Sequence, residues 1–191
     1  MAAHSNITIS APSVEHRSEI LRVVTDAFDQ KLEAELVDRF WADNSIIVET
    51  IASVDDKPVG YAAISPVTVS HTDGTVTAAM GLAPVAVSPP LQRQHIGTRM
   101  VESLLDDAFQ CFPDQAVFVL GDAGYYARFG FHSVESRGYR WEGGKVGQAF
   151  QARLRNGSPP PTLSSSDDNE IEAPATIHYC DAFRVFDGET A

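Results

Sequence analysis

The sequence contains few of the residues on which several classes of protein depend. Two of its 191 residues are cysteines, Cys111 and Cys180, which is too few for a disulfide framework, and their separation is not typical of metal ligands. Lys and Arg number 14 against 26 Asp and Glu, and this net charge of −12 argues against binding to nucleic acid. The excess of acids fits a protein that attracts cationic ligands, and it equally fits a protein that is simply well solvated.

Long apolar runs are also absent. The longest stretch without a strongly polar residue, Ala78 to Val87, is about half the roughly 20 residues that a membrane-spanning helix needs, so no membrane partner is expected. The first ten residues show no apolar segment after a basic start, so we expect no secretory signal. With so few cysteines, the expected compartment is the reducing cytoplasm. The histidines are scattered without ligand spacing, and we predict no metal site.

Enough apolar residues remain for one hydrophobic core. They make up 43% of the chain, and the length predicts a single domain over residues 1–191. Residues 156–175 are rich in proline, serine and acids, which predicts a disordered loop or linker. Strand character returns from Thr176 to Phe186.

Hydrophobic periodicity predicts alternating strands and helices. Apolar residues recur at helical spacing from Val14 to Trp41, with a break near Asp29, and again from Ile96 to a stop at Phe112-Pro113. Strands are expected at 7–10, 45–54, 59–70, 75–87 and 116–120, with a brief helical stretch at 123–129 and a hairpin region at 139–154. The order β-αα-βββ-α-β-α-ββ indicates an α+β fold with a mixed, mostly antiparallel central sheet flanked by helices.

The most informative stretch is Val85–Arg99, VAVSPPLQRQHIGTR. A strand ends, a polar loop follows, and a helix begins at a turn that contains Gly97. The first backbone N–H groups of a helix lack internal partners and its dipole is positive there, so this turn can bind an anion. Arg93 and Arg99 add positive charge. On its own, the pattern is equally typical of an ordinary connection with solvated arginines.

A second stretch is Gly121–Phe131, GDAGYYARFGF, which places Tyr125 and Tyr126 side by side on a short helix. Aromatic residues at this density are, in isolation, more typical of a core than of a site.

Together, and in this order, the two stretches resemble the GNAT superfamily of acyl-CoA-dependent N-acetyltransferases. LAPVAVSPPLQRQHIG is similar to its motif A region, in which Q/R-x-x-G-x-G/A binds the cofactor pyrophosphate, and GDAGYYARFGF is similar to motif B, which ends in Y-x-x-x-G-F. The closer resemblance is to a bacterial predicted N-acetyltransferase subgroup with a late Y-x-x-A-F, here Tyr179–Phe183. The resemblance covers Ile7 to Arg155 and resumes at Thr176. It departs at His95, where the motif has its first glycine; histidine is among the residues enriched at positive φ, so the turn can survive.

The resemblance implies a fold whose fourth and fifth strands splay apart, and a reaction in which an amine attacks the thioester of acetyl-CoA. It implies that backbone groups of Val85, Ala86 and Val87 bind the pantetheine and polarise the carbonyl. It assigns the pyrophosphate to the loop and helix start, namely Gln92, Arg93, Gln94, His95, Ile96, Gly97, Thr98 and Arg99. Tyr126 is expected to protonate the departing thiolate. Tyr125 is the competing candidate, although its spacing to Gly130 differs from the motif by one residue.

The general base is less well specified. In this subgroup the second helical segment faces the acceptor pocket, which makes Glu35 the first candidate, with Glu33, His71 and Asp73 as alternatives. A water chain would also suffice for an α-amine, whose pKa is near 8. The expected acceptor is a small-molecule or peptide amine, and the C-terminal strand could pair with a second copy in a homodimer. The alternative function is a catalytically idle acyl-CoA-binding or regulatory domain on the same fold.

Overall fold

The structure is a computed structural model that describes residues 7–163 and 175–187. Its strands are β1 (Ile7–Ser10), β2 (Val48–Val54), β3 (Lys57–His71), β4 (Val76–Val87), β5 (Val117–Leu120), β6 (His132–Ser133), β7 (Tyr139–Trp141), β8 (Phe150–Arg153) and β9 (Ala175–Tyr179). Its α-helices are α1 (Arg17–Phe28), α2 (Leu32–Ala42), α3 (Ile96–Cys111) and the short α4 (Ala123–Tyr126). Its 3₁₀ turns are η1 (Val14–His16), η2 (Pro89–Leu91), η3 (Ala127–Phe129), η4 (Glu135–Arg137), η5 (Gly147–Ala149) and η6 (Asp181–Asp187).

The strands form a mixed sheet in the order β1-β2-β3-β4-β5-β8-β6, and β9 pairs with both β3 and β7. The β1–β2, β2–β3, β5–β8, β6–β8 and β3–β9 pairs are antiparallel, whereas β4–β5 and β7–β9 are parallel. The predicted α+β fold with a mostly antiparallel sheet is therefore confirmed. The ladder between β4 and β5 joins Met80 to Val117 and Gly81 to Phe118. Pro84, further along β4, has no N–H to extend a ladder; the splaying of the two strands beyond Gly81 stays a prediction.

The chain separates into two compact units, each assembled from distant segments. The described residues of unit 1 lie within Met1–Ser65, Ala83–Gln110 and Asp181–Ala191, and those of unit 2 within Pro66–Leu82 and Cys111–Cys180. That these units form a single domain stays a prediction.

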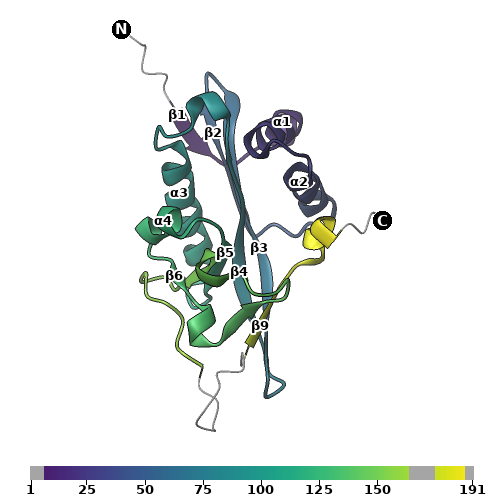
Figure 1. The fold of residues 1–191 in the computed structure, drawn as a ribbon. Coiled ribbons are helices and arrows are strands. Elements are labelled where there is room, and N and C mark those ends of the chain that lie inside the picture. Colours follow the sequence, from purple (N-terminus) through teal and green to yellow (C-terminus); the bar gives the residue numbers. More distant parts are fainter. Residues whose placement is uncertain (1–6, 164–174, 188–191) are drawn as a thin grey trace. The chain divides into compact units, whose positions relative to one another are not determined.

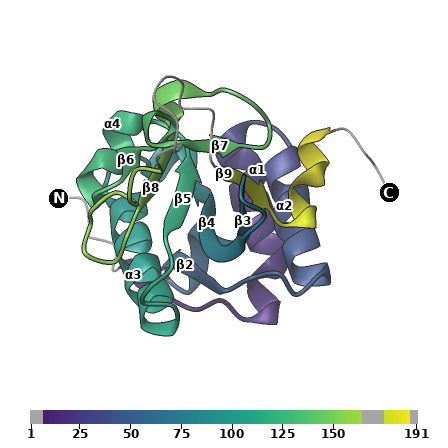
Figure 2. The same cartoon turned by 90° about the horizontal axis from the view of Figure 1, so that it is seen from below.

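In unit 1, helices cover both faces of the β1–β3 part of the sheet. Figures 1 and 2 show α1 and α2 on one side and α3 on the other. The predicted break near Asp29 is confirmed: this residue has φ 54° and ends α1. Helix α3 buries one face, which consists of Ile96, Met100, Val101, Leu104, Leu105, Ala108 and Phe109. Each large apolar side chain so buried contributes about 1.5–3 kcal/mol.

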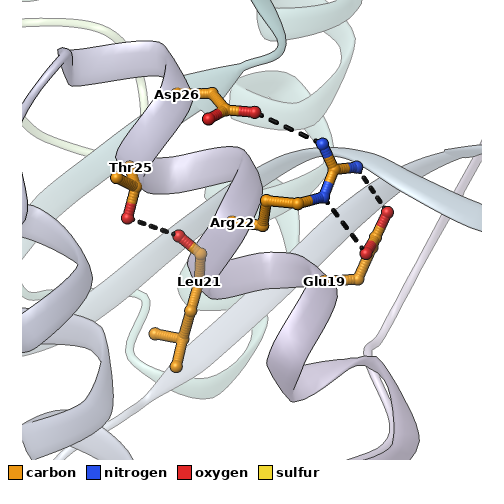
Figure 3. Close-up of polar contacts among 5 residues, drawn as sticks. All are labelled: Glu19, Leu21, Arg22, Thr25 and Asp26. Atoms are coloured by element: carbon orange, nitrogen blue, oxygen red, sulfur yellow. Dashed lines mark hydrogen bonds and ion pairs between the residues drawn. The ribbon is translucent and has the colours of Figure 1, made fainter.

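The outer face of α1 is polar. Arg22 donates to the carboxylates of Glu19 and Asp26, and the Thr25 hydroxyl donates to the Leu21 carbonyl oxygen (Figure 3). Exposed pairs three or four residues apart stabilise a helix by only about 0.2–0.5 kcal/mol each. These contacts therefore support α1 without marking a functional site.

Unit 2 has its own aromatic core. The Phe118 ring of β5 stacks on that of Phe150 at a centroid distance of 5.6 Å and lies 5.8 Å from that of Tyr139. Valine, alanine and isoleucine side chains from β3, β4, β8 and β9 complete this cluster together with Val134, and Leu163 packs against it.

Two sequence predictions in unit 2 are wrong. Residues 139–154 do not form a hairpin, because β7 pairs in parallel with β9 (Figure 2) and β8 pairs with β5 and β6. The connection between them is instead held by the Glu135 carboxylate, which accepts N–H bonds from Val146 and Gly147. The strand expected at Thr176–Phe186 stops at Tyr179, and η6 follows.

The first part of the segment predicted to be disordered makes contacts with neighbouring strands and turns. Residues 156–163 make contacts within unit 2: the Tyr139 hydroxyl donates to the Pro161 carbonyl, the Arg137 guanidinium donates to the Thr162 hydroxyl, and the Arg137 carbonyl accepts the Leu163 N–H. Leu163, the one large aliphatic side chain of residues 156–163, packs against the aromatic core, while the disordered loop over 156–175 stays a prediction. Residues 164–174, the rest of that prediction before β9, lie outside the described residues.

These contacts predict a measurable contribution to stability. Replacing residues 156–163 by a Gly/Ser linker of equal length should lower the free energy of unfolding by about 1–3 kcal/mol, through loss of Leu163 burial and of proline stiffness. Denaturant unfolding of the two proteins measures the difference. An unchanged midpoint would show that the contacts contribute nothing.

Candidate functional site

The turn between β4 and α3 has the geometry of an anion site. Arg93 and His95 are both in the left-handed region, with φ 61° and 62°, and both side chains are exposed. The His95 carbonyl accepts the Arg99 N–H at 3.1 Å, so the helical hydrogen bonding of α3 begins here. The following N–H groups of a helix lack internal partners. The expectation that histidine can occupy the position of the motif glycine at positive φ is confirmed.

Several side chains assigned to the pyrophosphate support the loop instead. The Gln92 amide donates to the Val87 carbonyl at 3.0 Å, and the Gln94 amide donates to the Pro90 carbonyl at 3.3 Å. Arg99 donates to the Ile7 carbonyl of β1 at 3.1 Å, and Ile96 is buried in the core. The backbone of Gly97 and Thr98 and the guanidinium of Arg93 thus remain the groups of the turn best suited to bind an anion.

The end of β4 leads into this turn. Ala86 is buried, whereas Val85 and Val87 are half-buried on the opposite side of the strand. Beyond Val87, the Ser88 N–H donates to the Val59 carbonyl of β3 at 2.9 Å, which continues the pairing of unit 1. The strand therefore holds the start of the turn rigidly.

The strained turn predicts the result of one substitution. His95→Gly should preserve or tighten CoA binding, because glycine adopts φ near 60° without the cost of a Cβ and opens the approach to a phosphate. Isothermal titration with CoA measures the affinity. Binding weakened about tenfold or more, equivalent to about 1.4 kcal/mol, would show instead that the imidazole contacts the ligand.

Tyr126 lies on α4 in unit 2. Asp122 caps this short helix by accepting the Tyr125 N–H, and the Tyr126 ring packs on Phe131 with centroids 5.7 Å apart. Only glycine fits at position 121, because an added Cβ would lie 2.6 Å from the Tyr126 ring. Burial, followed by the neighbouring Tyr125, raises the pKa of Tyr126 above its usual value. The phenol therefore stays protonated at neutral pH.

Tyr125 has different surroundings. The guanidinium of Arg128 lies 4.8 Å from the centre of its ring, and Arg128 also donates to the Tyr125 carbonyl. The ring meets Tyr126 and Phe129 edge to face, at 5.0 and 5.5 Å. Tyr125 thus covers the short helix and helps to fix the orientation of Tyr126.

The candidate bases differ in their roles. Glu35 is exposed on α2, whereas neighbouring Glu33 accepts from Gln30 and has its other oxygen shielded from solvent. His71 contacts Thr77 across the β3–β4 turn. Asp73 accepts from the hydroxyl and N–H of Thr75, and these bonds lower the pKa of Asp73. His71 and Asp73 thus support the turn.

Sequence reasoning missed a polar cluster between α2 and the sheet. The Glu49 carboxylate accepts the Trp41 indole N–H at 3.0 Å and the Tyr61 hydroxyl at 2.8 Å. The sequence showed only that a single acid, Glu49, lies within an Ile- and Val-rich strand. Its partners Trp41 and Tyr61 are 8 and 12 residues away in the chain, so the sequence did not indicate the cluster.

The described residues 7–163 and 175–187 offer neither a metal centre nor a membrane-spanning helix. They contain no group of three or more His, Cys, Asp or Glu side chains placed to hold a metal ion. None of their helices has the length and apolarity to cross a membrane.

A mixed sheet with a parallel β4–β5 pair, helices on both faces of its first strands and a left-handed turn between β4 and α3 matches the architecture of GNAT acetyltransferases. A model of the acetyltransferase (GNAT) family matches residues 16–131. The uncharacterized N-acetyltransferase YhbS of Escherichia coli (strain K12) is 30% identical over 152 residues, covering 79% of this chain and 85% of that protein. The chain belongs to the GNAT acetyltransferase family, as its motifs predicted.

Solved structures agree on the fold. The crystal structure of E. coli YhbS in complex with CoA superposes with a TM-score of 0.77 at 23% identity, covering 96% of this chain and 95% of that one. A GNAT family acetyltransferase from Brucella melitensis in complex with acetyl-CoA gives 0.69 at 26% identity, covering 94% and 99%.

Proposed function

We propose that this protein transfers an acetyl group from acetyl-CoA to an amine, with the pyrophosphate bound at the turn between β4 and α3. The observation that supports this most directly is the left-handed pair Arg93 and His95 immediately before α3, within the residues that match the family. The similar proteins YhbS and the Brucella acetyltransferase bind CoA and acetyl-CoA. Backbone N–H groups at a helix start suit a pyrophosphate.

The proposed step is a direct transfer. The neutral amine nitrogen forms a bond to the acetyl carbon, the carbon–sulfur bond breaks, and its electron pair leaves on sulfur. Backbone groups of Val85, Ala86 and Val87 bind the pantetheine, and one N–H polarises the carbonyl. Tyr126 gives its proton to the sulfur, and the surplus proton of the amine passes to Glu35 or to water. A phenol of raised pKa is a weak acid, so its proton moves as negative charge develops on sulfur.

The alternative function, a catalytically idle acyl-CoA-binding domain, differs from the transferase in that it releases no thiol from acetyl-CoA when an amine is added. We propose to follow free thiol released from acetyl-CoA with a panel of primary amines, alongside acetyl-CoA binding by calorimetry. Amine-dependent thiol release supports the transferase. Tight binding without release from any amine supports the idle domain. The low number of cysteines, two in the whole sequence, fits a reducing cytoplasm as the compartment.

The raised pKa of Tyr126 predicts the pH dependence. The protonated phenol is the active form and is lost only as pH rises through the raised pKa, so kcat should not fall between pH 7 and about pH 10. Thiol release at saturating acetyl-CoA and amine measures kcat. A falling limb below about pH 10 that disappears in Tyr126→Phe would contradict the assignment.

A further inference from the structure

One face of β2 and β3 carries polar groups against α2. Glu49 pairs with Ala63, and Ile51 pairs with Tyr61, so these side chains share the face on which Glu49 and Tyr61 meet Trp41. Tyr61 is fully buried, whereas Trp41 and Glu49 are partly exposed. The carboxylate is therefore fixed by two aromatic donors and still borders solvent.

The Glu49 carboxylate has two neutral donors and no direct ion pair with any Lys, Arg or His within the described residues. Burial and the adjacent carboxylate raise the pKa of Tyr61 well above its usual value, so its hydroxyl remains a donor. The Trp41 ring already accommodates a cation: the Arg17 guanidinium lies 4.9 Å from its centre. The Glu49 carboxylate lies at the N–H edge of the indole, and a carboxylate with only neutral donors can still accept from an ammonium group.

A second polar group on the same face lacks a partner. Ser65 follows Tyr61 and Ala63 on alternate positions of β3, is fully buried, and its hydroxyl has no hydrogen-bond partner among the described residues. Leaving a buried hydroxyl without a partner is unfavourable, so a polar ligand group that reached Ser65 would gain a hydrogen bond there. As the diagonal neighbour of Glu49 across the β2–β3 pair, Ser65 lies about 7–8 Å from it.

We propose that this face binds the acceptor and selects a dibasic amine: one amine is acetylated, while the second, protonated one is held by the Glu49 carboxylate. This inference rests on the proposed acetyl transfer. An alkyl ammonium with a pKa near 10 is charged at neutral pH, and the net charge of −12 favours the approach of such a dication. Ser65 provides a hydrogen-bond partner for a polar group further along the acceptor.

The test compares 1,4-diaminobutane with 4-amino-1-butanol, which replaces the second amine by a hydroxyl. Wild type should show a kcat/KM about tenfold or more higher for the diamine. Glu49→Gln keeps an oxygen for Trp41 and Tyr61 but removes the charge, so the ratio should fall to about one while turnover of the amino alcohol is retained. The matched control Asp38→Asn removes a charge from the exposed face of α2 and should keep the ratio.

A binding measurement, together with the kinetics above, separates this inference from the proposed function. The chain has two tryptophans, so Trp41 fluorescence can be followed in a Trp141→Phe protein during titration with 1,4-diaminobutane. Saturable binding without thiol release supports the site and refutes the transferase. Thiol release with equal kcat/KM for both amines, or a diamine preference that survives in Glu49→Gln, overturns the site and leaves the transferase standing.

Discussion

Tyr126→Phe should lower kcat about 100-fold while barely changing the affinity for acetyl-CoA. The hydroxyl acts only as the thiolate leaves, so its removal affects the transition state and not the bound ground state. General acid catalysis typically contributes about 10²–10⁴-fold, and the low end applies if water substitutes. The ring itself keeps its packing against Phe131 and Phe129, at 5.7 and 6.4 Å. Thiol release at saturating amine, with calorimetric binding of acetyl-CoA, measures both quantities.

Tyr125→Phe is the matched control, because it deletes the same atom one residue earlier. Its ring is held by Arg128 and Phe129, and one step along a helix turns a side chain by about 100°. We expect a much smaller loss of kcat. Equal rates for wild type and Tyr126→Phe would remove Tyr126 from the mechanism, and the thiolate would then take its proton from water or from the acceptor ammonium.

Phe118→Ala should destabilise the protein by about 3–5 kcal/mol. Phe118 is 1% exposed, stacks on Phe150, and pairs through its backbone with Gly81 of β4. Truncation removes the ring contacts and leaves a cavity in a core that relaxes only partly. Because typical stabilities are about 5–15 kcal/mol, the loss should be evident in denaturant unfolding.

Leu120→Ala on the same strand is the control. This side chain is 40% exposed, so its removal should cost less than about 1 kcal/mol. Similar losses for the two variants would mean that Phe118 is not a central contact of unit 2.

Local sequence determined where the helices of this protein begin and end. The break at Asp29, the start of α3 after His95 and its stop before Phe112-Pro113 all depend on residues within a few positions of one another. The order of the two motifs was sufficient to indicate the family, and His95 could be predicted to tolerate positive φ. These features follow from backbone sterics and from the interactions of near neighbours, which a sequence displays directly.

Only the tertiary structure shows the strand pairs, core contacts and hydrogen bonds that join residues far apart in the chain. The sequence around β7 predicts one strand of a local hairpin, but β7 pairs with β9, for example Tyr139 with Ala175, 36 residues further along the chain. Pairing across such a distance cannot be predicted from local hydrophobic periodicity. Leu163 packs against a core with residues from β3, β4, β5, β8 and β9. Glu49 looks like an ordinary strand residue until the chain brings Trp41 and Tyr61 to one of its oxygens. The strength of each of these contacts depends on burial and geometry, which only the folded chain provides.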